Sequence, residues 1–153
     1  MKILVVSDSH RDSELLHNLV KKYPDMDYYL HAGDSCDFSY SIAPFDSVKG
    51  NCDYYDYDEK RFLRTPYGNI LMRHYPTLSR DEAKDINIFI YGHTHEYDIS
   101  NRDGIIWLNP GSVSLPRDGS NGTYAIITLE KEQKSIDIID IITKNVLLHY
   151  LIS

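Results

Sequence analysis

The sequence has few cysteines and no long apolar run. Its two cysteines, Cys36 and Cys52, lie in polar, loop-like segments without the spacing of a paired motif, which favours a reducing compartment over a disulfide framework. The apolar stretch at residues 3–6 is too short for the hydrophobic region of a secretory signal, and no segment approaches the length that spans a bilayer. We therefore expect a soluble, cytoplasmic protein without a membrane partner.

The sequence also lacks an excess of positive charge. Sixteen basic and twenty-three acidic residues give a formal net charge of −7, which works against the wrapping of a polyanion and makes polymeric nucleic acid an unexpected partner. A length of 153 residues is enough for a substantial core but leaves no room for a separate substrate-binding domain. The prediction is a single domain over residues 1–153, and a homo-oligomer is left open.

The first third of the chain has the pattern of a βαβ unit. A β-branched run at residues 2–7 predicts a buried strand, and a helix follows that Asp12 or Ser13 can cap and that ends near Pro24. A second strand is expected at 28–31. Because such units are parallel, Asp8 and Asp34 should lie at the same edge of one sheet.

The rest of the chain is mostly β. Two hairpins are expected, one around Pro66-Tyr67-Gly68 and one built on Asp103-Gly104, and Ser79 can cap one or two helical turns within 79–85. The further strands are predicted at 45–49, 61–65, 69–73, 86–91, 97–101, 105–108, 123–129, 135–142 and 146–152. Many strands with few helices predict an α/β fold of two mixed β-sheets packed as a sandwich, with sparse flanking helices.

Seven side chains that can bind a metal follow apolar runs, at the places where strands stop. They are Asp8, His10, Asp34, Asn51, His74, His93 and His95. Carboxylate, imidazole and amide ligands together suit borderline divalent ions, and one carboxylate can bridge two of them, which suggests a two-metal centre. If the chain stays extended after its strands, the side chains within Asp8-x-His10 and within His93-x-His95 point the same way. Alone, Asp8-x-His10 is more typical of a turn with a surface histidine, and Gly92-His93-Thr94-His95 could equally be structural.

The order of these segments resembles a known family. An Asp-x-His, a Gly-Asp at 33–34, a Gly-Asn at 50–51, His74 and a Gly-His-x-His at 92–95 follow the pattern of the calcineurin-like metallophosphoesterases. The Gly-Asn-Cys-Asp segment at 50–53 is similar to that of the small bacterial and archaeal phosphodiesterases of this superfamily. The resemblance spans nearly the whole chain and implies their fold and a dinuclear metal centre.

The resemblance also implies a division of the ligands. One ion would be held by Asp8, His10, Asp34 and His95, and the other by Asp34, Asn51, His74 and His93, with Asp34 as the bridge. A hydroxide shared by the two ions would attack a small phosphodiester directly. Mn²⁺ is the expected ion, and Fe, Zn, Co or Ni also suit the ligand set.

Two segments depart from the family pattern. Many relatives have a histidine where this chain has Cys52, and a thiol is a poorer general acid for a basic leaving group, which favours diesters over unactivated monoesters. Close relatives often have Thr-His-Gly-His where this chain has Arg73-His74-Tyr75-Pro76. The candidates for a direct part in catalysis are Asn51, Cys52, Asp53 and His74. For Asp53, proton relay and loop support are both open.

The sequence is also compatible with other functions. A protein-interaction scaffold on the same fold, as in the retromer subunit that resembles this family, would not need the imidazoles of His10 and His95. A nuclease is a third alternative, which the acidic charge disfavours. His31 could orient a ligand or be a core residue, Arg73 could bind phosphate or solvent, and the tyrosines at 54, 55 and 57 could stack on a nucleobase or cover an interface.

Overall fold

The computed structural model describes residues 1–153 as eleven strands, two α-helices and one short 3-10 helix. In chain order the elements are β1 (Lys2–Val6), α1 (Ser13–Lys22), β2 (Tyr28–His31), η1 (Ser39–Ser41), β3 (Asp46–Ser47), β4 (Lys60–Thr65), β5 (Gly68–Arg73), α2 (Arg80–Ala83), β6 (Ile88–Ile90), β7 (Tyr97–Arg102), β8 (Ile105–Pro110), β9 (Thr123–Leu129), β10 (Lys134–Asp140) and β11 (Val146–Leu151). No helix is both long and apolar enough to cross a bilayer.

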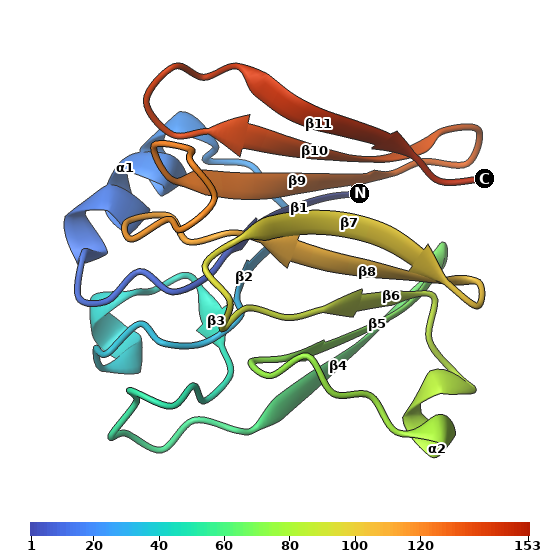
Figure 1. Cartoon of the computed structure of the whole chain (residues 1–153), viewed down its shortest axis with the longest axis horizontal. Coiled ribbons are helices and arrows are strands. Elements are labelled where there is room, and N and C mark those ends of the chain that lie inside the picture. Colours follow the sequence, from blue (N-terminus) through green and yellow to red (C-terminus); the bar gives the residue numbers. More distant parts are fainter.

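The strands form two mixed sheets that lie one above the other, as predicted (Figure 1). The six-stranded sheet has the order β11-β10-β9-β1-β2-β3, in which β1 pairs in parallel with β2 and β2 with β3, while the pairs from β11 to β1 are antiparallel. The five-stranded sheet has the order β4-β5-β6-β8-β7, with β6 parallel to both β5 and β8. The predicted βαβ unit and both hairpins are confirmed.

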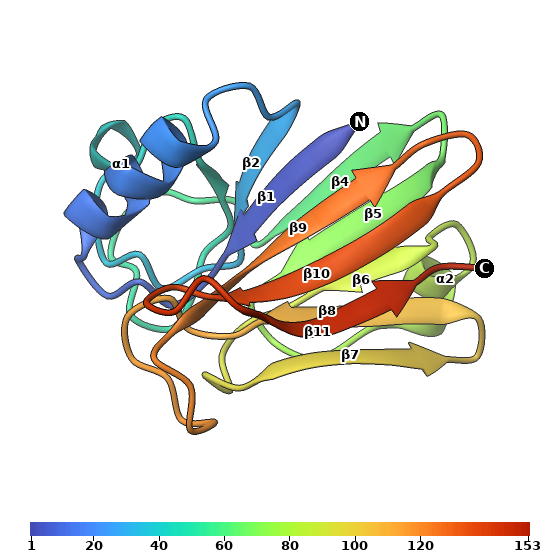
Figure 2. The same ribbon diagram turned by 90° about the horizontal axis from the view of Figure 1, so that it is seen from above.

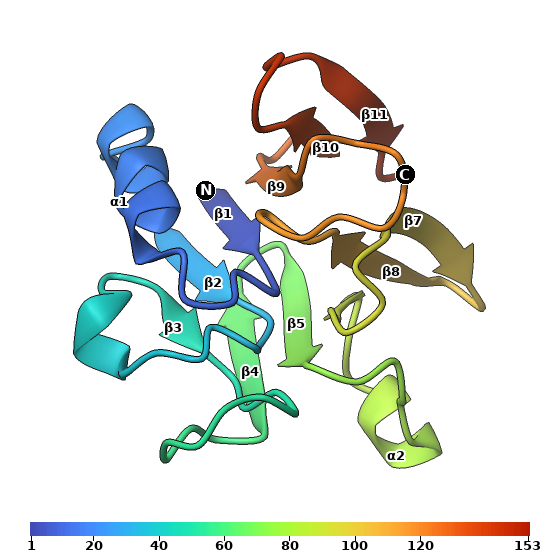
Figure 3. The same cartoon turned by 60° about the vertical axis from the view of Figure 1, so that its left-hand side comes forward.

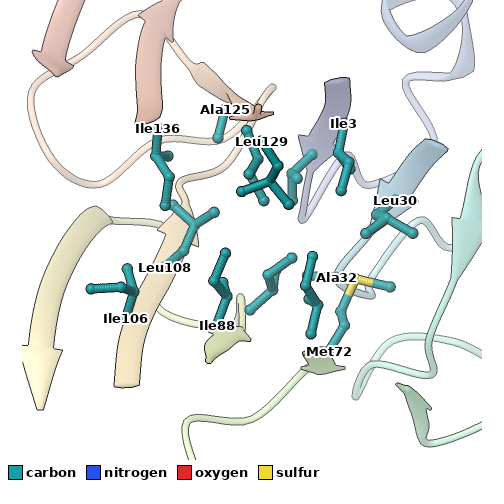
Figure 4. Close-up of a cluster of buried hydrophobic side chains, with 14 of the residues drawn as sticks. Ile3, Leu30, Ala32, Met72, Ile88, Ile106, Leu108, Ala125, Leu129 and Ile136 are labelled. Atoms are coloured by element: carbon teal, nitrogen blue, oxygen red, sulfur yellow. The ribbon is translucent and has the colours of Figure 1, made fainter. Parts of the chain in front are cut away.

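The main core lies between the sheets, and strand alternation explains its composition. Ile3 and Val5 of β1 face inward, as do Ile88 and Ile90 of β6, and all four are buried. Figure 4 shows how side chains of the two sheets meet in this layer. Because successive strand residues point to opposite faces, the other β1 side chains are left for a second cluster on the outer face.

Helix α1 covers that outer face (Figure 2). Its buried residues Leu16 and Leu19 pack in one cluster with Leu4 and Val6. Asp12 caps the helix by accepting a hydrogen bond from the Leu15 amide at 3.2 Å. The helix therefore holds β1 from outside, beside the loop that follows that strand.

Several element bounds differ from the prediction. Strand β3 has only two residues, and β6 spans three rather than the six predicted at 86–91. Ile86 and Tyr91 instead pack in a third cluster on the outer face of the five-stranded sheet. The 3-10 helix η1 has no apolar periodicity and was not predicted. The capping box of Ser79 and Glu82 at α2 is present as expected.

Candidate metal centre

The predicted ligands lie in the loops that follow five strands, and these loops meet at one edge of the molecule. Asp8 and His10 follow β1, Asp34 follows β2, and His74 directly follows β5. Asn51 follows β3, whereas His93 and His95 follow β6. Figure 3 turns this edge of the molecule toward the viewer and shows the ends of β1, β2 and β5 close together.

The first group of ligands surrounds the carboxylate of Asp8. Asp8 Oδ1 lies 3.3 Å from His95 Nε2 and 4.0 Å from His10 Nε2. His10 Nε2 is in turn 3.9 Å from Asp34 Oδ2. Asp8, His10 and His95 therefore offer three ligand atoms to one ion, with Asp34 beside them.

The second group extends from Asp34. Asp34 Oδ2 lies 3.4 Å from His74 Nε2, which is 3.0 Å from Asn51 Oδ1. The same Asn51 oxygen is 3.3 Å from His93 Nδ1. Asp8 Oδ1 is also within 3.9 Å of His74 Nε2, so both carboxylates border this group. The structure thus gathers all seven predicted ligands around Asp8 and Asp34.

Two of the imidazoles are oriented by backbone carbonyls. His74 Nδ1 lies 2.7 Å from Ala32 O, and His95 Nδ1 lies 2.7 Å from Leu115 O. A carbonyl oxygen can only accept a hydrogen bond, so each Nδ1 carries the proton and each Nε2 directs a lone pair into the centre when the ring is neutral. This is the tautomer that an Nε2 metal ligand requires.

The residues fit divalent cations. Asp8 Oδ1 and His10 Nε2 are buried and have no hydrogen-bond partner, although an unpaired buried polar atom is unfavourable. Burial raises the pKa of Asp34, but the neighbouring His74, in its protonated form, and the hydrogen bond from the Cys52 amide outweigh it and bring the pKa to about 2. The carboxylate is therefore ionised at neutral pH and available to a cation.

The backbone at the ligands corrects one expectation. The chain is not extended at the two His-containing pairs, because the residues at the turns have left-handed conformations. Their φ values are 52° at Asp8, 42° at His10, 61° at Asp34, 72° at His93 and 61° at His95. Left-handed conformations are rare for residues other than glycine and cluster at functional sites. Sharp turns after each strand, rather than period-two alternation, aim these side chains at one another.

Several supporting residues were not predicted from the sequence. Asp8 Oδ2 accepts hydrogen bonds from Ser7 Oγ at 2.6 Å and from the His93 amide at 3.1 Å, which leaves Oδ1 for the centre. Ser112 Oγ donates to the backbone oxygen of Asp8 at 2.8 Å. Asn109 Nδ2 donates to Gly92 O at 3.1 Å, so the segment from Asn109 to Ser112 packs under the site. A serine next to a ligand has no sequence signal that separates it from any loop serine.

Asp53 holds the loops together rather than facing the ligand atoms. Its buried carboxylate accepts backbone hydrogen bonds from Gly50 at 2.7 Å, Cys36 at 2.9 Å and Asp34 at 3.0 Å. Of the two roles left open for Asp53, these contacts favour loop support over proton relay. Its neighbour Cys52 lies beside the centre, where its amide donates to Asp34 Oδ1 at 2.8 Å. Burial is the main cause that raises the pKa of the Cys52 thiol.

Other candidates have structural partners. His31 is fully buried between Ser9 Oγ and the Gly33 amide, and burial lowers its pKa to about 4. The guanidinium of Arg73 is bound by both carboxylate oxygens of Glu82, at 2.6 and 3.0 Å, so it is not free to bind phosphate. Arg117 is exposed.

The tyrosines near the site differ in whether they pack against the protein or are exposed to solvent. Tyr57 donates to the backbone oxygen of Asp37, and Tyr55 packs against Phe38 with ring centroids 3.7 Å apart. Tyr54 is 86% exposed and Tyr75 is 40% exposed. The ring of Tyr75 lies 5.0 Å from that of His93. It also lines a cavity of about 490 Å³ with Lys49 and Asn51. Tyr54 and Tyr75 are thus the tyrosines exposed at the rim.

Comparison with known proteins identifies the class. Residues 1–132 match the model of the calcineurin-like phosphoesterase superfamily domain. The chain therefore belongs to this superfamily, whose metallophosphoesterases bind divalent ions. Within it the chain is similar to the probable metallophosphoesterase YsnB of Bacillus subtilis, with 30% identity over 154 residues that cover 92% of this chain and 91% of that protein.

Two solved structures support the fold assignment. A predicted phosphoesterase from Streptococcus pneumoniae TIGR4 superposes with a TM-score of 0.84 at 25% identity, covering 98% of this chain and 97% of that one. The phosphoesterase YfcE of Escherichia coli superposes over 100% of both chains with a TM-score of 0.79 at 19% identity. In sequence, the phosphodiesterase YfcE of strain K12 is 31% identical over 70 residues, which are 45% of this chain and 35% of YfcE.

Proposed function

We propose that the protein is a phosphodiesterase that uses two divalent ions, Mn²⁺ first among them, to hydrolyse a small phosphodiester. The observation that carries this proposal is the convergence of seven donor side chains from five loops around Asp8 and Asp34. Two ions held there would supply a hydroxide nucleophile near neutral pH and neutralise charge on the phosphoryl oxygens.

The chain's own groups prepare the site for that reaction. The amide of His93 and the hydroxyl of Ser7 fix one oxygen of Asp8, while the amide of Cys52 fixes one oxygen of Asp34. The free oxygens therefore keep their positions without reorganisation. Lys49 and the ring of Tyr75 line the cavity beside Asn51, where they can contact the organic part of a substrate.

The preference for diesters rests on Cys52. Its thiol keeps its proton at neutral pH, because burial and the nearby Asp34 raise the thiol pKa. A thiol so placed is a weak acid for protonating an alkoxide, so esters with activated leaving groups or a second ester arm are the expected substrates. The adjacent Asp53 carboxylate is occupied by three backbone amides and does not replace it.

The ligand set disfavours a pure scaffold. His10 Nε2 and Asp8 Oδ1 are buried without partners, an arrangement that lowers stability unless a cation binds. A nuclease is disfavoured by the net charge of −7, since polymer binding draws on many phosphate contacts. The cytoplasm remains the proposed compartment, and a small phosphorylated metabolite the proposed partner.

Activity on a chromogenic diester tests the proposal. The full chain is loaded with Mn²⁺ and assayed on bis(p-nitrophenyl) phosphate and on the corresponding monoester, followed by a screen of phosphorylated metabolites. We expect faster turnover of the diester and a loss of at least about 10³-fold in Asp34→Asn, with an unchanged circular dichroism spectrum. His149→Ala, in the last strand, is the control. Full activity in a folded Asp34→Asn, or no activity in the loaded wild type, would contradict the proposal.

A further inference from the structure

The only two cysteines of the chain meet beside the metal centre. One ligand atom each from His10, Cys36 and Cys52 lie within 4.8 Å of one another. Cys36 Sγ is 3.7 Å from His10 Nδ1, the ring nitrogen that faces away from the carboxylates of the centre. The sequence does not indicate this cluster, because the cysteines have no motif spacing and come from separate loops.

Backbone hydrogen bonds fix both cysteines in place. The amide of Cys36 donates to Asp53 Oδ1 at 2.9 Å, and the amide of Cys52 donates to Asp34 Oδ1 at 2.8 Å. Cys36 also has a left-handed φ of 57°, a conformation that only a well-determined loop retains. The two sulfur atoms are therefore brought together by the same carboxylates that organise the centre.

The spacing and the charge of the cluster suit a thiophilic cation. Zinc bonds of about 2.3 Å to sulfur and about 2.0 Å to nitrogen place tetrahedral ligand atoms roughly 3.5–3.8 Å apart, close to the 3.7 Å between Cys36 and His10. The charges of Asp34 and Asp53 act on both cysteines and favour a bound cation. His10, Cys36 and Cys52 also line an open cavity of about 250 Å³ with Arg11 and Tyr54, which gives access from solvent and room for a water ligand.

We propose that His10, Cys36 and Cys52 form a separate site for a thiophilic divalent cation such as Zn²⁺ or Cd²⁺, and that this site competes with the dinuclear centre for His10. On binding, each thiol releases one proton to solvent as its sulfur bonds the ion. A neutral imidazole has one lone pair, so His10 cannot serve both sites through Nδ1 and Nε2 at once. Occupation of the thiol site withdraws a ligand from the dinuclear centre and inhibits it.

Cadmium binding tests the site without any activity assay. The metal-free, reduced full chain is titrated with Cd²⁺ while the ultraviolet thiolate-to-cadmium absorption is recorded and bound metal is counted. We expect the absorption in the wild type and its loss in Cys36→Ser and in Cys52→Ser, each of which should bind one Cd²⁺ fewer. Absorption that persists in both folded serine variants, or that is absent from the reduced wild type, would overturn the proposal.

Two further variants separate this proposal from the proposed function. His93→Ala removes a ligand of the dinuclear centre only, so its cadmium absorption should equal that of the wild type whether or not the protein is a phosphodiesterase. His17→Ala, which changes an exposed histidine on α1, is the matched control for a lost imidazole.

In the Mn²⁺-loaded enzyme, Cys36→Ser should raise the Zn²⁺ concentration for half inhibition at least about tenfold. If the wild type and Cys36→Ser were equally sensitive to Zn²⁺, the competition for His10 would be ruled out.

Discussion

The carboxylate of Asp53 accepts a hydrogen bond from the backbone amide of Asp34 at 3.0 Å, so a residue that faces none of the candidate ligand atoms sets the position of a central predicted ligand. The same carboxylate binds the amides of Gly50 and Cys36. It thereby ties the loop after β2 to the loop after β3.

Replacing Asp53 with asparagine should loosen both loops. The asparagine amide group cannot accept the Cys36 amide hydrogen while its oxygen keeps the other two, and the negative charge is lost. We expect a loss of about 1–3 kcal/mol in the free energy of unfolding and a 10–100-fold loss of Mn²⁺ affinity. Thermal denaturation and calorimetric titration measure the two effects. Asp56→Asn, at an exposed position of the same loop, should leave both unchanged; wild-type metal affinity in Asp53→Asn would refute the positioning role.

Gly50 is required for a different reason, namely the space next to Asp34. A Cβ at Gly50 would lie 2.0 Å from Asp34 Oδ1 and 2.5 Å from Asp34 N, so Gly50→Ala must displace this ligand. We expect at least a tenfold loss of Mn²⁺ affinity, measured by titration calorimetry. Gly104→Ala is the contrast, because its Cβ meets nothing within 4 Å although its φ is +87°. That variant should lose about 1 kcal/mol of stability and keep its metal affinity.

Much of this site follows from where the strands stop. The apolar runs before Asp8, Asp34 and His93 predict strand ends, and parallel pairing of β1 with β2 and of β5 with β6 brings those ends to one edge. The gathering of these candidate ligands at one edge was therefore predictable from the sequence. Their side-chain directions were not, because the left-handed turns at Asp8 and His93 carry no signal in residues other than glycine.

Contacts between loops were the least predictable part. Nothing in the sequence pairs Cys36 with Cys52, and the hydrogen bond from the Cys36 amide to Asp53 holds it beside Cys52. Arg73 reads equally well as a phosphate ligand until its ion pair with Glu82 is known. Such partners are distant in sequence, and nothing in local periodicity encodes which loop side chains will meet.

A pH dependence of stability is expected at the turn between β10 and β11. Although burial raises the pKa of Asp140, hydrogen bonds from the amides of Thr143, Asn121 and Ile142 lower it from 3.8 to about 2. A depressed folded-state pKa means that the contribution is present above the unfolded value and is lost as the pH falls through the folded value.

Urea unfolding of Asp140→Asn measures this contribution. At about pH 7 the variant should be less stable than the wild type by about 1 kcal/mol, and the difference should shrink as the pH falls from about 4 toward 2. Asp25→Asn, at an exposed position, should show no such trend. A difference that stays constant over this range would mean that the Asp140 charge does not stabilise the turn.

Metal loading should stabilise the fold, because the buried, unpartnered atoms of Asp8 and His10 can bind an ion together only in the native state. At an Mn²⁺ concentration about 100-fold above the dissociation constant, the gain is about 2.7 kcal/mol, or roughly 5–10 °C in melting temperature. His93 is exposed and is a predicted ligand of the other ion, so His93→Ala should melt near the wild-type temperature without metal and lose part of the shift when Mn²⁺ is added. Differential scanning calorimetry with and without a chelator separates the two effects. If His93→Ala kept the full Mn²⁺-induced shift, His93 would not be a ligand, whereas a large drop in its metal-free melting temperature would assign it to the fold.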